Sequence, residues 1–225
     1  RDFCLSRGLG DVYKRQMNTH IHVLEAYTAL YKVWKDNSLC KRLAKVIDLI
    51  TTRLYNPQTH HLISYCDLNW NNLDDIDSYG HDIETSWLLT EAAEALGDPE
   101  VIGRCRKVAL ELADASLKEG INPMGAMMYE RHKDKIRKDA SWWCQAETVV
   151  GCINAWQLTG EQSYLDSAVR TWNFIKSRMI DKEYGEWFRT VLEDGTPRYK
   201  EPKASMWNCP YHNSRMGFEI DTRLK

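Results

Sequence analysis

The feature that most constrains the fold is an internal repeat in which one helix ends, turns tightly and passes into the next. The pattern occurs at residues 26–38, 89–99 and 152–161. The copies are roughly 60 residues apart, a spacing longer than that of common solenoid repeats and typical of a helical hairpin with a long return loop. Each unit is therefore expected to contain a helix, a short turn, a second helix and a loop with a short extended piece.

Apolar residues at helical spacing predict the helices themselves. Val46, Leu49 and Ile50 share one helix face, as do Trp172 and Ile175. On this pattern we expect helices at residues 18–35, 38–55, 81–96, 99–118, 141–158 and 161–179, and a last one from residue 211. The return loops should hold short extended pieces at residues 60–65, 126–130 and 186–192, with a hairpin turn at 193–195.

Two helix starts have characteristic residues. Asp98 precedes Pro99, which is the combination of an N-cap residue and a proline at the first helical position. Ser38 is of a residue type that often caps a helix, so we expect it to cap the second helix.

Composition excludes several classes of protein. The chain has 225 residues, of which 43% are hydrophobic, and a formal charge of -2. This balance gives no electrostatic reason to expect nucleic acid or a membrane surface as a partner, and no apolar stretch is long enough to span a bilayer. The seven cysteines contain no C-x-x-C pair. An odd number of scattered cysteines favours reduced thiols in a cytoplasmic protein, and packing rather than nucleophilic catalysis as their role.

The two ends of the chain differ from the repeat. Residues 1–16 do not fit it, and residues 6–16 resemble a translated sequencing adapter, so we interpret this segment as an artefact and residues 17–225 as the folded part. The chain stops inside or just after the helix that begins near Tyr211. Successive hairpins of this number are expected to form an open arc of a larger toroid.

A candidate site lies at the starts of the first helices of the hairpins. His81 and Glu84 are three residues apart, so they share one helix face, and Trp87 follows one turn later. Similar clusters begin the other first helices, at residues 17–22, 141–147 and 207–213. If the hairpins wrap radially, these helices form an inner ring whose N-termini converge on one cavity. Helix N-termini also carry partial positive charge, which stabilises a developing oxyanion.

Each of these residues also has an ordinary structural interpretation. A lone His81 often caps or packs a helix, Glu84 is a common first-turn residue, and Trp142 and Trp143 taken singly are typical core residues. His20 and His22 cannot face the same way on one helix, and we interpret His20 as the structural one. Only the joint recurrence of the clusters favours a functional site.

The motifs resemble a known family. Residues 17–26 (MNTHIHVLEA), 80–87 (GHDIETSW), 142–147 (WWCQAE) and 207–213 (WNCPYHN) are similar to those of the cellobiose 2-epimerases, within the N-acylglucosamine 2-epimerase superfamily. The resemblance implies an all-α fold, an incomplete (α/α)6 barrel of which this chain holds the C-terminal part. It also implies that the family's N-terminal half, which supplies an arginine and a tyrosine to the site, is missing, so that this chain alone would be inactive. The full-length enzyme is expected to be monomeric.

The resemblance assigns a role to each candidate residue. His81 and His212 would be the acid/base pair, with Glu84 supporting His81. The remaining residues would contact the sugar, line the pocket or tune the pair: Asn18, His22, Trp87, Trp142, Trp143, Glu147, Trp207 and Arg215. Among these, Trp143 and Trp207 would stack against the sugar rings.

The implied reaction suits these residue types. Epimerisation at C2 of a reducing sugar requires ring opening, removal of the proton next to the C1 carbonyl, and return of a proton to the opposite face. Histidine suits both steps because its pKa lies near neutral pH. The scheme requires no metal and no other cofactor, and the lack of an H-x-x-x-H pair on a helix argues against a zinc site built from three histidines.

Two other functions stay open at this point. The chain could be a glycoside hydrolase of the α/α type that uses Glu84 and Glu147 as paired carboxylates. It could also be a glycan-binding domain without catalytic activity. Within the epimerase interpretation the substrate is a disaccharide such as cellobiose, and activity on mannose or N-acetylglucosamine is the alternative.

Overall fold

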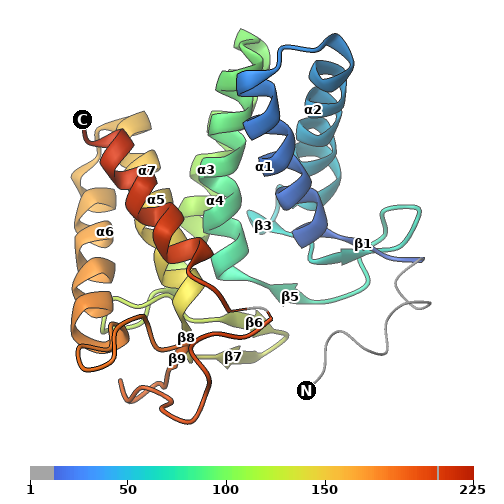
Figure 1. Cartoon of the computed structure of the whole chain (residues 1–225). Coiled ribbons are helices and arrows are strands. Elements are labelled where there is room, and N and C mark those ends of the chain that lie inside the picture. The colour runs from blue at the N-terminus through green and yellow to red at the C-terminus, as the bar shows by residue number, and fades with distance from the viewer. Residues whose placement is uncertain (1–12, 207) are drawn as a thin grey trace.

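The computed structural model describes residues 13–206 and 208–225, and all helices predicted from the sequence are confirmed (Figure 1). Two of the helices, α2 and α6, end in a π-helical turn, η2 (Ile50–Leu54) and η3 (Ile175–Met179). The helices in chain order are α1 (Met17–Val33), α2 (Asn37–Leu49), α3 (Tyr79–Leu96), α4 (Pro99–Gly120), α5 (Trp142–Thr159), α6 (Gln162–Phe174) and α7 (Tyr211–Arg223).

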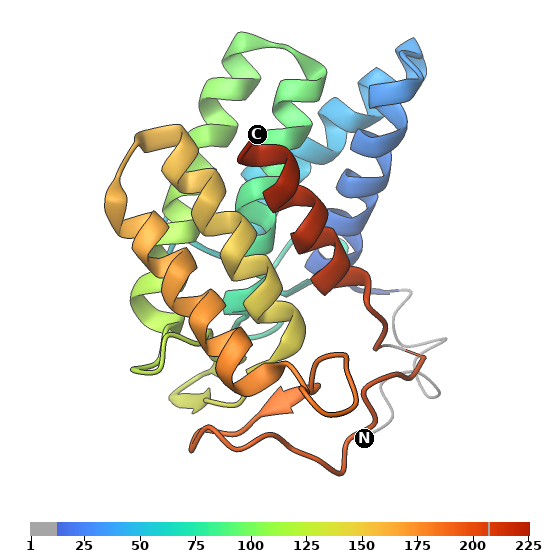
Figure 2. The ribbon, with the colours of Figure 1, turned by 60° about the vertical axis from the view of Figure 1, so that its left-hand side comes forward.

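The helices form three successive antiparallel hairpins, followed by α7 (Figure 2). Helix α1 packs against α3, α3 against α5, and α5 against α7, so the odd-numbered helices are neighbours. Helices α3 and α5 are buried around most of their circumference, whereas α2 and α6 bury one face only. A helix that is buried all round lies in the interior of a fold. The predicted inner position is therefore confirmed for α3 and α5, which α1 and α7 flank in the same row.

Within residues 13–206 and 208–225, nine short strands gather at the end of the molecule where the odd-numbered helices begin (Figure 1). They form small antiparallel sheets with the pairings β1–β4, β2–β3, β5–β6–β7 and β8–β9. The strands are β1 (Arg15–Gln16), β2 (Tyr55–Asn56), β3 (His61–Leu62), β4 (Tyr65–Cys66), β5 (Ile76–Asp77), β6 (Glu130–His132), β7 (Lys135–Arg137), β8 (Ala140–Ser141) and β9 (Thr190–Val191).

Each extended piece predicted in the return loops contains strand residues. The hairpin turn at 193–195 is also confirmed, since Gly195 has a φ of 82° and its N–H donates to the Leu192 carbonyl over 2.9 Å. The interpretation of residues 1–16 stays a prediction. Residues 1–12 lie outside the described part of the chain, while Arg15 and Gln16 pair with β4.

One predicted helix cap is confirmed and one is wrong. The Asp98 carboxylate accepts hydrogen bonds from the N–H groups of Glu100 (2.9 Å) and Val101 (3.3 Å) and caps α4. The second helix, however, begins at Asn37 and is capped by Asp36, whose carboxylate accepts from the Ser38 N–H over 2.8 Å. A charged carboxylate at a helix N-terminus forms stronger hydrogen bonds than a hydroxyl and also favours the helix dipole. Ser38 therefore lies inside the helix.

The described cysteines are free thiols, as predicted: Cys40, Cys66, Cys105, Cys144, Cys152 and Cys209. Among the described residues, no helix combines the length and the apolar character that crossing a membrane requires.

Two glycines allow α3 and α5 to approach closely. A Cβ atom at Gly151 on α5 would lie 2.6 Å from Cγ1 and 2.8 Å from the carbonyl oxygen of Ile83 on α3. At Gly80, a Cβ atom would lie 2.6 Å from Sγ of Cys144. At each of these two positions the backbone of the glycine lies directly against a residue of the other helix.

We expect Gly151→Ala to lower the free energy of unfolding by about 1–3 kcal/mol, because the added methyl group overpacks a rigid backbone contact. Urea unfolding of the chain measures this. Gly103→Ala is the matched control, since a Cβ atom at Gly103 on α4 meets no atom within 4 Å. It should be neutral or stabilising by up to ~1 kcal/mol, the difference in helix propensity. If Gly151→Ala raised the free energy of unfolding as much as Gly103→Ala does, α3 and α5 could move apart without an energetic cost.

Candidate active site

The first turns of the odd-numbered helices bring a set of charged and aromatic side chains together around Arg215. Nη2 of Arg215 lies 2.5 Å from Oε1 of Glu84 and 2.7 Å from Oε1 of Glu147, and Nη1 lies 2.5 Å from Oε1 of Glu25. One guanidinium on α7 is thus paired with carboxylates on α1, α3 and α5. We call this set the Arg215 network: His22, Glu25, Glu84, Glu147, Tyr211, His212 and Arg215.

Burial and neighbouring charges together shift the pKa values of the Arg215 network. Glu84 and Glu147 are almost fully buried. Burial, together with the charge of Glu147, raises the pKa of Glu84. Burial would raise the pKa of Glu147 too, but the hydrogen bond from His212 and the charge of Arg215 hold it below its usual value. The carboxylates in turn raise the pKa of Arg215, against the effect of its own burial. Glu147 and Arg215 therefore form a buried, fully charged pair.

His81 lies at the start of α3 in an environment that keeps it neutral. Its Nδ1 is 2.7 Å from the Ser78 hydroxyl oxygen. Desolvation of the ring, and the nearby charges of His22 and His212, lower its pKa to about 3. At neutral pH the ring is therefore uncharged, with one of its two nitrogens unprotonated.

The predicted role of Glu84 as the support of His81 is wrong. One carboxylate oxygen of Glu84 pairs with Arg215, and the other has no hydrogen-bond partner among the described residues. The hydrogen-bond partner of Nδ1 of His81 is the Ser78 hydroxyl. The reason lies in the packing: α7 places a full positive charge beside Glu84, and an ion pair with Arg215 compensates a buried carboxylate better than a neutral imidazole does.

His212 is held by Glu147. Its Nδ1 lies 2.7 Å from Oε1 of Glu147, whose other oxygen accepts a hydrogen bond from Nε1–H of Trp87 over 2.9 Å. The carboxylate thus fixes the orientation of the imidazole. Trp87 is almost fully buried, and the Arg215 guanidinium lies 4.9 Å from the centre of its ring. Trp87 therefore belongs to the inner support of the site.

Trp143 connects the two histidines. Its ring centre lies 4.6 Å from that of His81 and 5.7 Å from that of His212. The side chain is buried, with 8% of the residue exposed, and its ring plane is tilted by 47° from that of His81 and by 39° from that of His212. Trp142 is partly buried and meets His212 edge-on at 6.3 Å. Stacking of either indole on a sugar stays a prediction.

Sequence reasoning missed three residues of the site: Ser78, Glu25 and Tyr211. Tyr211 donates a hydrogen bond to Glu25. Nδ1 of His22 lies 3.1 Å from Oε2 of Glu25, and this contact raises the pKa of His22. Although burial opposes it, the partners of Glu25 lower its pKa to about 2. A signal was available, because Glu25 follows His22 by three residues and so shares its helix face.

The remaining predicted residues lie in different places. His20 hydrogen-bonds the Gln16 carbonyl over 2.7 Å and meets Trp70 edge-on, as expected for the structural histidine of its pair. Asn18 is exposed in the first turn of α1, outside the Arg215 network. Trp207 lies outside the described residues.

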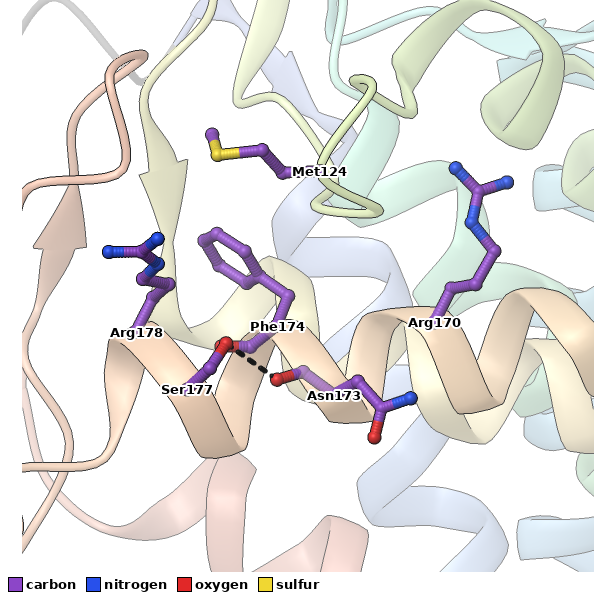
Figure 3. Close-up of a pocket in the computed structure, with 6 residues that line it drawn as sticks. All are labelled: Met124, Arg170, Asn173, Phe174, Ser177 and Arg178. Carbon is purple, nitrogen blue, oxygen red and sulfur yellow. Dashed lines mark hydrogen bonds between the residues drawn. The ribbon is translucent and has the colours of Figure 1, made fainter.

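Ligand atoms of Glu84, Glu147 and His212 lie within 4.8 Å of one another, a set that could hold a metal ion. Arg215 already binds both carboxylates, so a guanidinium supplies the positive charge here. A cavity of about 360 Å³ lies elsewhere, on the surface of α6 and η3 (Figure 3). The cavity is lined by Met124, Arg170, Asn173, Phe174, Ser177 and Arg178. Two of these residues are arginines and none forms an acid/base pair, so we place the candidate active site at the Arg215 network instead.

Most of this chain is similar to proteins of one known family. The sequence profile of the N-acylglucosamine 2-epimerase (GlcNAc 2-epimerase) family matches residues 6–213. The cellobiose 2-epimerase of Bacteroides fragilis is 42% identical over 209 residues, which cover 92% of this chain and 53% of the relative. The cellobiose 2-epimerase of Ruminococcus albus is 39% identical over 214 residues, covering 93% and 54%. The chain thus spans about half the length of these curated relatives.

Solved structures agree. The cellobiose 2-epimerase of Bacillus thermoamylovorans B4167 superposes with a TM-score of 0.90 at 36% identity, over 97% of this chain and 56% of that one. A possible GH105 family member from Salmonella enterica has a TM-score of 0.72 at 15% identity, which shows a shared fold only. The all-α hairpin architecture is therefore confirmed, and the chain belongs to the N-acylglucosamine 2-epimerase family.

Proposed function

We propose that this site inverts C2 of the reducing-end glucose of cellobiose or a related β-1,4-disaccharide, giving mannose at that position. The observation that carries the proposal is the placement of His81 and His212 against the same indole, Trp143, in different electrostatic environments. Membership of the family supports a sugar substrate. The cellobiose 2-epimerases among the relatives, at 42% and 39% identity, support the disaccharide.

The geometry suits proton transfer at one carbon. In the open-chain sugar, the hydrogen at C2 is acidic because it lies next to the C1 carbonyl. A neutral imidazole such as His81 can remove it, leaving a cis-enediolate, and a second imidazole can return a proton to the opposite face. His212 is suited to this second role because Glu147 occupies its Nδ1 and leaves Nε2 for the substrate. In the reverse direction the two histidines exchange roles.

The contacts of the carboxylates argue against hydrolysis. A glycosidase of the paired-carboxylate type needs one carboxyl group that is free to donate a proton to the leaving group. Here Glu84 and Glu147 are almost fully buried and both pair with the same nitrogen of Arg215, so neither carboxyl group is presented to a sugar. A purely glycan-binding domain would not require two histidines with distinct partners around one indole.

The test uses a chimera, because the chain spans about half the length of its relatives. Residues 17–225 would follow the N-terminal half of the Bacteroides fragilis enzyme, whose own activity is the positive control. With cellobiose in deuterated water, NMR should show conversion of the reducing-end glucose to mannose, with deuterium entering at C2. A folded chimera that releases free glucose, or that converts cellobiose without deuterium at C2, would contradict the proposal.

A further inference from the structure

A second group of titratable side chains lies outside the Arg215 network. It consists of His61 on β3, Asp77 on β5 and Glu119 in the last turn of α4. One ligand atom from each lies within 4.8 Å of the other two. His61 is 1% exposed, Asp77 is buried, and Glu119 reaches the surface. The group therefore combines a buried imidazole with two carboxylates near the solvent boundary.

The environment of His61 is that of a metal-binding imidazole. Its Nδ1 lies 2.8 Å from Oδ2 of Asp82, and the other oxygen of Asp82 accepts the Leu62 N–H over 2.9 Å. Burial opposes a charge on this ring, but Asp82, Asp77 and Glu119 raise the pKa of His61 to about 9. A metal ion would have to displace the proton from Nε2, and the lone pair of the ring with its proton on Nδ1 would then face the ion. Histidines that bind metals commonly donate their second N–H to a carboxylate in this way. Nε2 of His61 is buried and has no hydrogen-bond partner within the described part of the chain.

The distance between two of these ligand atoms fits a tetrahedral ion. Nε2 of His61 lies 3.4 Å from Oε2 of Glu119, without the geometry of a hydrogen bond. Two ligands of a tetrahedral zinc, each ~2.0–2.1 Å from the metal, are separated by about 3.4 Å. The last turn of a helix also carries partial negative charge, so the end of α4 favours a cation. Asp77 already forms an ion pair with Arg131. A bound metal ion would share the Asp77 carboxylate with this guanidinium.

We propose that His61, Asp77 and Glu119 bind a divalent transition metal ion, Zn²⁺, which joins β3, β5 and the end of α4. A mixed set of one imidazole and two carboxylates suits zinc better than magnesium or calcium, which prefer oxygen ligands alone. Asp77 precedes Ser78, whose hydroxyl holds Nδ1 of His81. The bound ion would therefore fix the loop that positions His81. This proposal does not depend on the proposed epimerase activity.

The competing interpretation is a proton on Nε2 of His61, which would make the group a buried ion cluster. Calorimetric titration of the chelator-treated chain with ZnCl₂ distinguishes the two. We expect a single site with a Kd below ~10 μM. Asp82→Asn should weaken binding by about 10–100-fold, the usual effect of changing the carboxylate behind a metal-binding histidine. Glu119→Gln should weaken it at least ~10-fold, because a ligand is lost.

Three controls locate the ion. Glu100→Gln, at the exposed start of the same helix, should leave zinc binding unchanged. His212→Ala should also leave it unchanged, which separates this site from the Arg215 network. Co²⁺ in place of Zn²⁺ should give visible bands of a tetrahedral ion without a thiolate charge-transfer band, which excludes the cysteines. Absence of zinc binding to the chain, or equal binding by Glu119→Gln, would overturn the proposal, as would loss of binding in His212→Ala.

Discussion

His81→Ala and His212→Ala, each made in the chimera, are expected to lower kcat for cellobiose by about 10²–10⁴-fold, the usual contribution of a general acid or base. Each variant removes one of the two imidazoles that lie against Trp143, so in the proposed reaction proton removal or proton return at C2 would depend on water. Neither side chain carries the core packing, because both are only partly buried. The fold should therefore persist, as circular dichroism can show.

His20→Ala is the matched control for both variants. His20 lies on the same helix as His22 but contacts Gln16 and Trp70, away from the Arg215 network. Its kcat should stay within about 2-fold of the chimera, since only an electrostatically remote hydrogen bond is lost. If either His81→Ala or His212→Ala kept a kcat near that of His20→Ala, that histidine would have no place in the mechanism.

Arg215→Met should lower the free energy of unfolding by about 3–5 kcal/mol at neutral pH, the range for breaking a buried ion pair by removing one partner. The guanidinium is 11% exposed and pairs with Glu25, Glu84 and Glu147. Methionine fills part of the volume but leaves these carboxylates without their cation. Urea unfolding of the chain itself measures the effect, so this prediction requires no chimera.

The same variant should respond to pH in a definite direction. Without Arg215, burial raises the pKa values of the carboxylates in the folded state above their unfolded values. The folded variant then binds more protons than the unfolded chain, and its stability rises as the pH falls from about 7.5 to 5. Lys225→Met is the control, because its pair with Asp221 on the same helix is exposed. It should change stability by less than ~1 kcal/mol. An Arg215→Met variant no less stable than Lys225→Met would show that the network is not needed for folding.

The helices could be predicted from the sequence because their signals are local. Apolar periodicity and the Asp98-Pro99 start depend on residues within one or two turns, and so does the glycine that ends α3, Gly97. The strands were harder to define, because each is two or three residues long and pairs with segments far along the chain. Arg15, for example, pairs with Cys66. Such pairings depend on how the hairpins pack.

The contacts of the candidate site likewise divide into local ones, which the sequence predicts, and long-range ones, which it does not. Pairs on one helix face, such as His22 with Glu25 or His212 with Arg215, follow from a spacing of three residues. The partner of Glu84 did not follow. His81 is its neighbour in sequence, yet its ion pair is with Arg215, 131 residues later. Which carboxylate meets which cation depends on the packing of α7 against α5, and no local pattern records that packing.

Gly80 has a consequence for how the two histidines are spaced. The residue before His81 has no side chain, and a Cβ atom there would lie 2.6 Å from the Trp143 ring. Because residue 80 has no side chain, the backbone of α3 itself lies against the indole, and no rotamer change at this position can alter that contact. Gly80 therefore helps to set the distance between the His81 imidazole and the Trp143 indole, the same ring that lies against His212. The proposed epimerisation must reach both faces of one carbon, and any residue larger than glycine at position 80 would shift His81 relative to the indole.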